Sequence, residues 1–590
     1  MKRLLITTAD ENTWRTDRPV LFLGEWCRLY DRRTAWEGLD AEVVPYHWDD
    51  RRRFDRDYDR AQDVYDRLLR ASSDALNAYH HTGHSLRYWR TLIGQWLFHL
   101  VHVLLDRWQV VLDASDGYDI EETLIYDLPP ATMISARFAG GIFQDTTWNH
   151  HLFGRVIRHQ NRIRWRLVPA PAARALPVSR RGVRRAARTR LRDATCNLLA
   201  RFTAPGEPLI IRSYLPRLQE IALQLMLGQI PKAWTPPAVP GVVPDMARRG
   251  QFVVTPGAAD PFVRFAAAMI PEQIPTVFLE GYGELRRAAA ELPWPPRPRV
   301  IFTSNLDQAN EVFQEWSAAK AEAGYPLVIG QHGGFVGLAK RHPGEDDQRR
   351  IADRYLSWGW HDSDVRIHPT AALTNVGKPM RTWKASGDLL LVTVPMRLYA
   401  FRCMSTPVGA TQSAAFVGDQ ISFGKALPDH IRARLILRIE EAIDRTLHTC
   451  YVSRWKDAVP GLRVDPSVTP IERPLRRCRL FVYTYNSTGF LETLARDIPT
   501  VVFWNPEYFE LRAGAQPYFD LLTEARIFHR TPESAARHVS DIWDDVRGWW
   551  RDPALQRIRE AFCAQYARMP ERPLQAVKDA LLTVRPPARQ

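Results

Sequence analysis

The fold of this chain is decided by the stretch Arg479-Leu-Phe-Val-Tyr-Thr-Tyr-Asn-Ser-Thr-Gly-Phe-Leu-Glu-Thr-Leu-Ala-Arg-Asp-Ile-Pro-Thr-Val-Val-Phe-Trp504. Its apolar, β-rich run at 480–485 predicts a strand that ends in a polar triplet at 486–488. Apolar residues then recur at helical spacing from Phe490 to Ala495, and Pro499 ends that helix at the start of a second apolar strand, 498–504. A strand, a helix and a strand in this order form a βαβ unit, which predicts an α/β fold with parallel sheets.

The polar triplet Asn486-Ser487-Thr488 lies where the predicted helix begins. The first backbone N–H groups of a helix lack partners within it, and the helix dipole is positive there, so the triplet predicts a phosphate site. The alternative is an ordinary N-cap, because these residue types are the usual ones at that position. Glu492 lies five residues beyond Ser487, within reach of a ribose hydroxyl beside such a phosphate. The four residues together favour a nucleotide site.

Length and charge limit the classes of protein that the chain can belong to. Its 590 residues predict two to four domains. The net charge of +14 favours an acidic partner, such as a nucleotide, an anionic sugar, a membrane surface or nucleic acid, although a solvated basic surface needs no partner. The six cysteines have no CxxC spacing, which argues against a disulfide framework or a zinc site and fits a reducing cytoplasm.

The N-terminus and the longest apolar stretch indicate a cytoplasmic protein. Residues 1–10 become polar too early for a signal peptide and predict a first strand. The stretch 92–105 contains Gln95, His99 and His102 and is shorter than the roughly 20 residues that cross a bilayer. We therefore expect no transmembrane helix. The basic charge adds the inner face of the cytoplasmic membrane as a place where the protein can bind peripherally.

Polar residues follow several predicted strands of the N-terminal half. Asp10 and Glu11 come after the strand at 4–8, and Asp145 and Arg212 lie at further strand ends, where open α/β sheets place their ligands. His84 and Arg87 precede a long apolar helix and are candidate anion or sugar contacts, because an arginine fork suits carboxylate or phosphate. The histidines there can equally be loop residues that bond to the backbone.

Changes in composition suggest the domain boundaries. Pro293-Trp-Pro-Pro-Arg-Pro298 predicts a linker, so we expect an N-terminal acceptor domain at 1–295, a nucleotide-sugar domain at 296–535 and terminal helices at 536–590 that cross back to the first domain. A basic insertion spans about 170–192 and is either solvated surface or a helix on anionic lipid. Residues 430–451 predict a long helix on the second sheet.

The strand predicted at 326–330 ends in Gln331-His332-Gly333-Gly334. Two glycines allow a backbone to approach a ligand closely, and the imidazole before them can touch a phosphate or the reacting centre. A tight turn with an incidental histidine is the alternative. Because this edge should face the same crevice as Ser487, we favour a functional role for His332.

Several motifs together resemble a known family: Val20-Leu-Phe-Leu-Gly-Glu-Trp-Cys27, Glu42-Val-Val-Pro-Tyr-His-Trp-Asp-Asp50, Ser85-Leu-Arg-Tyr-Trp-Arg90, Ile329-Gly-Gln-His-Gly-Gly334 and Thr484-Tyr-Asn-Ser-Thr488. The combination resembles, nearly end to end, transferases first noticed in leptospiral O-antigen gene clusters. These look like GT-B glycosyltransferases of surface polysaccharides (O-antigen and capsule), and some are similar to enzymes that transfer nonulosonic acids from a CMP donor. The resemblance implies two Rossmann-like domains whose parallel sheets face a central cleft.

The resemblance also implies roles for individual residues. His332 would match the histidine that binds donor phosphate in bacterial GT-B sialyltransferases, and Ser487 and Thr488 would match their paired hydroxyl residues. Gln331, Gly333, Asn486 and Glu492 complete the expected donor site. The sequence departs from that pattern, since it has Gln-His-Gly where those enzymes have His-Pro.

The expected chemistry needs no metal and no cofactor besides the nucleotide-sugar donor. His332, the helix start at Ser487 and a basic side chain such as Arg87 or Arg212 would meet the charge of the departing nucleotide. In an inverting enzyme, Asp10, then Glu11, then Asp145 are the candidate bases for a hydroxyl of a glycan or lipid-linked glycan acceptor, whereas a retaining enzyme would use such a carboxylate differently. Two alternatives stay open: transfer of a polyol phosphate from a CDP-linked donor, and a basic protein that binds a membrane or nucleic acid. The second agrees poorly with residues 180–192, which contain no aromatic residue for stacking on bases.

Overall fold

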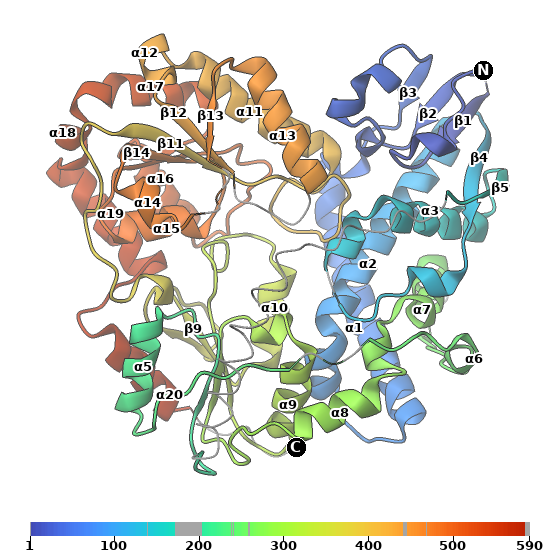
Figure 1. Cartoon of the computed structure of the whole chain (residues 1–590), viewed down its shortest axis with the longest axis horizontal. Helices are drawn as coiled ribbons and strands as arrows, with labels where there is room; N and C mark the ends of the chain where they lie inside the picture. Colours follow the sequence, from blue (N-terminus) through green and yellow to red (C-terminus); the bar gives the residue numbers. More distant parts are fainter. Residues whose placement is uncertain are drawn as a thin grey trace.

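The computed structural model describes residues 2–138, 140–171, 203–237, 239, 241–257, 260–439, 445–465, 467 and 469–584. Within these residues the strands form three sheets, and neighbouring strands are parallel in each of them. Figure 1 shows the N-terminal sheet beside the C-terminal part of the chain, with the middle sheet below them. The predicted α/β class with parallel sheets is confirmed.

The N-terminal sheet has the strand order β3-β2-β1-β4-β5. Its strands are β1 (Arg3–Ile6), β2 (Val20–Phe22), β3 (Ala41–Val43), β4 (Ile120–Asp127) and β5 (Trp165–Pro169). Its helices are α1 (Arg51–His80), α2 (Leu86–Gly117) and α3 (Thr146–Gln160). Helix α2 is buried along most of its length because it packs on α1 and α3 and also on α9 and α10 of the middle part. It thereby connects the N-terminal and middle sheets.

The middle sheet has the order β10-β9-β8-β7-β6. Its strands are β6 (Leu209–Ile210), β7 (Ile301–Thr303), β8 (Leu327–Gly330), β9 (Arg354–Ser357) and β10 (Ile367–Pro369). The helices of this part are α5 (Arg217–Met226), α6 (Met246–Arg249), α7 (Pro261–Gln273), α8 (Tyr282–Ala290), α9 (Glu311–Glu322) and α10 (Pro343–Ile351). Strand β8 is buried throughout and delivers the segment 331–336 to the carboxyl edge of the sheet.

The C-terminal sheet has the order β13-β12-β11-β14-β15-β16. Its strands are β11 (Asp388–Thr393), β12 (Leu435–Ile439), β13 (Arg463–Asp465), β14 (Cys478–Tyr483), β15 (Thr500–Phe503) and β16 (Phe528–His529). Its first helices are α11 (Ala410–Ala426), α12 (Asp429–Arg432), α13 (Arg445–Ala458), α14 (Glu472–Leu475), α15 (Thr488–Ala495) and α16 (Gln516–Glu524). The strand order reverses between β11 and β14, and open α/β sheets bind ligands at such a switch point.

The last helices leave the C-terminal sheet and return to the middle one. They are α17 (Pro532–Ile542), α18 (Val546–Trp550), α19 (Pro553–Tyr566) and α20 (Pro573–Leu582). Helix α19 packs on α15 and α16, whereas α20 packs on α5, as Figure 1 shows. Val577, Ala580 and Leu581 of α20 share a buried cluster with Phe302 of β7 and Val328 of β8. The C-terminal helices therefore connect the two sheets that flank the candidate site.

The structure differs from the expected organisation in two places. It has three sheets where two were expected, and β6, which precedes residue 295, pairs with β7, which follows it. Residues 430–451 do not form one helix, because Leu435–Ile439 is strand β12 beside β11. From residue 172 onward, the basic insertion expected at 170–192 lies outside the described residues. None of the helices in the described ranges combines the length and hydrophobicity that crossing a bilayer requires.

Candidate functional site

Two loops from different sheets meet at the candidate site. Gly334, beyond the carboxyl end of β8, donates its backbone N–H to the Thr488 hydroxyl at the start of α15, at 3.1 Å. A Cβ atom at Gly334 would lie 2.3 Å from the Ser487 carbonyl oxygen, so only glycine fits this approach. The structure therefore brings together the His332 and Ser487 segments, as the sequence predicted for a shared crevice.

Gln331 braces the loop that carries His332. Its side-chain NH₂ donates to the carbonyls of Gly333 at 2.8 Å and Val336 at 3.1 Å. Its side-chain oxygen accepts from the Trp358 backbone N–H and the Trp360 indole N–H, both at 2.8 Å. With both of its polar atoms bonded inside the protein, Gln331 shapes the loop and does not line either cavity described below, although we expected it in the donor site.

A cavity of about 650 Å³ opens at the reversal of the C-terminal sheet, and we call it the switch-point cavity. Val392 of β11 and Tyr483 of β14, which pair across the switch point, both line it. Asn486, Ser487, Thr488 and Glu492 also line it, as the sequence predicted for a nucleotide site. The cavity is therefore bounded by two strand ends and by the first turns of α15.

Several polar atoms of the switch-point cavity have no hydrogen-bond partner in the protein. The Ser487 hydroxyl, both side-chain polar atoms of Asn486 and one terminal nitrogen of Arg496 are buried in this state. Asn486 and Ser487 are only 3% and 6% exposed, so solvent does not readily satisfy them. Ser487 is at the N-cap position of α15 but makes no side-chain capping bond. Buried polar groups are normally bonded, so these atoms are available to a ligand.

The charged residues of this cavity suit a nucleotide. Arg496, the C-cap residue of α15, donates to the Pro379 carbonyl and the Thr382 hydroxyl, and its remaining nitrogen has no partner in the protein. Glu492 lies on the same helix face, 3.7 Å from the Lys378 ammonium. The start of α15 favours a phosphate, and the Glu492 carboxylate can accept hydrogen bonds from ribose hydroxyls.

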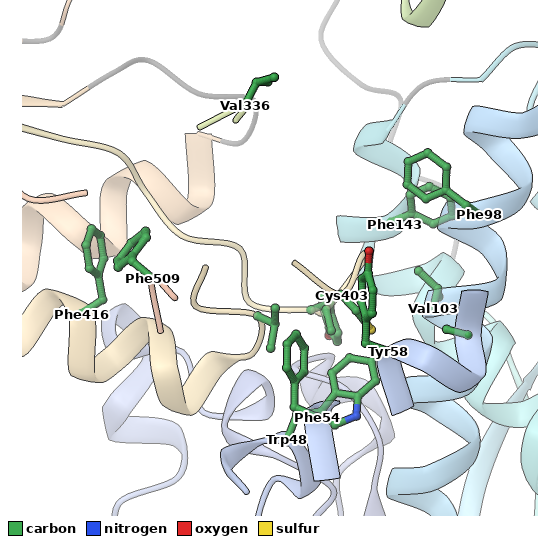
Figure 2. Close-up of a cluster of buried hydrophobic side chains, with 14 of the residues drawn as sticks. Trp48, Phe54, Tyr58, Phe98, Val103, Phe143, Val336, Cys403, Phe416 and Phe509 are labelled. Carbon is green, nitrogen blue, oxygen red and sulfur yellow. The ribbon is translucent and has the colours of Figure 1, made fainter. Parts of the chain in front are cut away.

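A second cavity of about 360 Å³, the central cavity, adjoins the first and shares Gly333, Phe335, Tyr485 and Asn486 with it. Its walls come from all three parts of the chain. Figure 2 shows three apolar members of the wall, Phe98 of α2, Val336 after β8 and Phe509 after β15, on separate segments. The polar members are Gln95, Gln144, Gln308, His332, His342, Arg397, Arg402, Thr406 and Asn486, together with the Tyr485 hydroxyl. None of the described residues that line it is Asp or Glu.

The two histidines of the central cavity are neutral at pH 7. Burial, and secondarily the charge of Arg402, lowers the pKa of His332 to about 4. Burial likewise lowers the pKa of His342 well below its usual value. His342 Nδ1 accepts the Glu345 backbone N–H at 2.9 Å, so its proton is on Nε2 and this ring can only donate from that atom. His332, whose Nδ1 has no partner in the protein, is the ring that is free to accept a proton.

The carboxylates that the sequence suggested as bases lie outside both cavities. Asp10 caps the turn at Glu11–Thr13 and accepts the Tyr126 hydroxyl at 2.7 Å. Glu11 forms a two-bond ion pair with Arg32, at 2.7 Å for each bond, which lowers its pKa. Asp145 caps α3 by accepting the Trp148 N–H. Each of the three carboxylates therefore has a structural role: Asp10 and Asp145 cap helices, and Glu11 forms an ion pair with Arg32.

The predicted substrate contacts are also engaged elsewhere. His84 stacks on Tyr88 and pairs with Glu322 at 2.7 Å. Arg87 binds the Ile351 carbonyl and Asp353, so both residues join α2 to the middle sheet. Arg212, in the left-handed region at φ 50°, is exposed at the end of β6, and its carbonyl accepts the Ser304 N–H. None of the three lines either cavity.

Sequence reasoning missed Arg397, Arg402 and His342. The two arginines lie on the irregular segment 394–409 that follows β11, and His342 precedes α10 by one residue. Arg397 lies beyond the end of β11 at Thr393, on an irregular segment, so its position in the sequence does not indicate that it reaches the central cavity. Within the described residues, no cluster of His, Cys, Asp and Glu side chains has the size and spacing to hold a metal ion.

Comparisons with known proteins give a family. The solved structures that the chain resembles include α,α-trehalose 6-phosphate synthase from Burkholderia multivorans, with 11% sequence identity, 51% of this chain and 76% of that chain covered, and a TM-score of 0.26. A TM-score this low supports no inference about this chain. No curated protein matches the sequence. The family model described as LIC12162 family transferase matches residues 3–581. Because the match spans nearly the whole sequence, this chain belongs to the LIC12162 family of transferases.

Proposed function

We propose that this transferase is a GT-B-type glycosyltransferase that binds the nucleotide of an activated sugar in the switch-point cavity and transfers the sugar in the central cavity. The observation that carries the proposal is the set of unbonded polar atoms at the start of α15, where Gly334 of the other sheet closes against Ser487 and Thr488. An anion at that point would receive hydrogen bonds and the positive end of the helix dipole.

In this arrangement the donor phosphate lies beside Ser487 and the first N–H groups of α15. The ribose lies against Glu492, and the sugar extends past Gly333 and Asn486, which border both cavities. As the bond between the sugar and the nucleotide breaks, the charge that develops on the phosphate is met by these fixed donors. Because these donors belong to the chain itself, we propose a metal-independent reaction.

His332 is the proposed base. It lines the central cavity as a neutral imidazole, and the described walls of that cavity offer no carboxylate. The acceptor hydroxyl transfers its proton to His332 while its oxygen bonds to the anomeric carbon and the nucleotide leaves. This changes the role expected from the resemblance, in which His332 would hold the donor phosphate.

For the donor we propose a nonulosonic acid linked to CMP, and for the acceptor a glycan or lipid-linked glycan of a surface polysaccharide such as O-antigen or capsule. The motif resemblance supports this class of reaction. We place the enzyme in the cytoplasm, and its net charge of +14 supports peripheral contact with anionic membrane lipids.

Thermal unfolding in the presence of CMP, CDP, UDP, GDP, TDP and CDP-glycerol tests the proposal, because a ligand of the native state raises Tm by mass action. We expect CMP at millimolar concentration to raise Tm. If only CDP-glycerol raised Tm, polyol-phosphate transfer would become the better proposal than glycosyl transfer. If no nucleotide raised Tm, the proposed donor site would be wrong.

A further inference from the structure

The segment 394–409 places two arginines in the wall of the central cavity. Arg397 and Arg402 lie against the ring of Phe401, at 3.8 Å and 4.7 Å from its centroid. The segment is fixed from the N-terminal part of the chain: Gln144 bonds to the Tyr399 backbone, with its NH₂ 2.7 Å from the carbonyl, and His102 accepts the Cys403 N–H at 3.1 Å. The two guanidinium groups are therefore held in place without a ligand.

Neither arginine has an acidic partner among the described residues. Arg397 donates to the Gly140 carbonyl at 3.2 Å, and the Nε of Arg402 is buried with no partner. Two buried arginines elsewhere in this protein are paired with acids. Arg249 is 2.6 Å from Glu280, and Arg90 is 3.3 Å from Asp347. Arg397 and Arg402 are partly buried, and a cation removed from water without a counter-charge is costly, so the pair indicates an anion that binds from outside the chain.

The electrostatic surroundings agree with an anion at this position. Burial lowers the pKa of Arg397 to about 10, and burial together with the charge of Arg397 lowers that of Arg402 to about 9. The charge of Arg402 is also among the causes that lower the pKa values of the histidines around the cavity, which are His99, His102, His332 and His342. The site thus concentrates positive charge with no acidic group in its described walls.

We propose that Arg397 and Arg402 bind a carboxylate carried by the transferred sugar. The inference rests on the proposed function, which assigns the nucleotide phosphate to the start of α15. A guanidinium fork matches a carboxylate by paired hydrogen bonds. The remaining wall contains the amide of Gln95 and the rings of Phe98 and Phe335, which suit the hydroxyl groups and the carbon faces of a sugar. The pair thereby selects acidic sugars over neutral ones.

Isothermal titration of the full-length protein with CMP and with CMP-N-acetylneuraminate tests this. For the wild type we expect the CMP-sugar to bind about tenfold or more tightly than CMP, the order of gain that charge-assisted hydrogen bonds give. Arg402→Gln and Arg397→Gln should abolish this gain and leave CMP affinity unchanged, whereas Arg402→Lys should retain part of it. Arg60→Gln is the control, because Arg60 pairs with Asp260 outside both cavities.

The outcomes separate the two claims. If CMP binds the wild type but the CMP-sugar binds no more tightly, or if the glutamine variants keep the gain, the carboxylate subsite is wrong while the donor site stands. If the glutamine variants lose CMP affinity itself, the arginines bind the nucleotide phosphate and the proposal is also overturned. If no nucleotide binds the wild type, the proposed function fails. If CMP affinity and Tm of the variants match those of Arg60→Gln, a loss of the gain cannot come from misfolding.

Discussion

Gly334 and Thr488 are 154 residues apart in the sequence and are joined by a hydrogen bond of 3.1 Å between the backbone N–H of the first and the hydroxyl of the second. The bond connects the loop beyond β8 to the start of α15. The switch-point cavity borders this contact, and the central cavity borders the neighbouring residues Gly333 and Asn486. The relative position of the two sheets is therefore fixed at the point where the donor is proposed to react.

Replacing Gly334 with alanine should disrupt this contact. The new Cβ would lie 2.3 Å from the Ser487 carbonyl, a backbone atom that cannot rotate away. We expect a loss of about 1–3 kcal/mol in the free energy of unfolding, the usual cost of overpacking, and a loss of nucleotide binding. Denaturant unfolding and titration with CMP measure the two effects. Gly83→Ala is the control, because a Cβ there meets nothing within 4 Å, and equal behaviour of the two variants would contradict the prediction.

Ser487→Ala and Thr488→Ala should separate binding from stability. The Ser487 hydroxyl makes no hydrogen bond in the protein. Ser487→Ala should therefore change the free energy of unfolding by less than about 0.5 kcal/mol and still weaken CMP binding. The Thr488 hydroxyl accepts the Gly334 N–H. Thr488→Ala should therefore weaken CMP binding and also lower the free energy of unfolding by about 1 kcal/mol. Parallel unfolding and titration experiments check this. A Ser487→Ala protein that binds CMP like the wild type would remove Ser487 from the site.

Gln331→Met should destabilise the loop without touching the ligand directly. It leaves the Trp358 backbone N–H and the Trp360 indole N–H without their acceptor, at about 1–3 kcal/mol for each buried orphan group. A lower Tm and weaker CMP binding should appear together. The exposed Gln516, which bonds only to Asp520, gives the matched control Gln516→Met. An unchanged Tm in Gln331→Met would show that the bracing bonds contribute little.

The base assignment predicts opposite results for two kinds of variant. His332→Ala should lower kcat by about 100-fold or more, the usual contribution of general base catalysis. Asp10→Asn and Glu11→Gln should leave kcat within about threefold, because their partners are Tyr126 and Arg32 rather than cavity atoms. Turnover with the donor found by the nucleotide screen measures this. A large loss of kcat in Asp10→Asn with normal CMP binding would show that Asp10 of the N-terminal sheet is the base.

The buried histidine also predicts a pH dependence of stability. The pKa of His332 falls from 6.5 to about 4 on folding, so between these values the unfolded chain binds more protons than the folded one. The stability contributed by neutral His332 is complete above pH 6.5 and is lost as the pH falls toward 4. Tm should therefore fall less between pH 7 and pH 4.5 in His332→Gln than in the wild type. The exposed His430→Gln should follow the wild type, and identical curves for all three proteins would contradict the shift.

The sequence predicts the strand ends of the site well for a physical reason. In parallel sheets the loops that carry ligands follow the carboxyl ends of apolar strands, and such strands are easily recognised around Leu480 and Ile329. His332, Asn486, Ser487, Thr488 and Glu492 were located in this way, and all five line the cavities.

Other features left no periodic signal. Strand β6 has only two residues, so its pairing across the proline-rich linker could not be predicted. The run Leu435–Ile439 contains leucines that suit either a helix or a strand, and its position beside β11 decides for the strand. Arg397 and Arg402 reach the central cavity because Gln144 and His102, distant in sequence, hold their segment.

The most direct test is a crystal structure of the full-length protein with CMP. We expect the nucleotide in the switch-point cavity, with a phosphate oxygen within hydrogen-bond distance of the Ser487 hydroxyl and the first N–H groups of α15, and with the ribose against Glu492. CMP bound elsewhere on the protein, with Ser487 and Asn486 still unbonded, would contradict it.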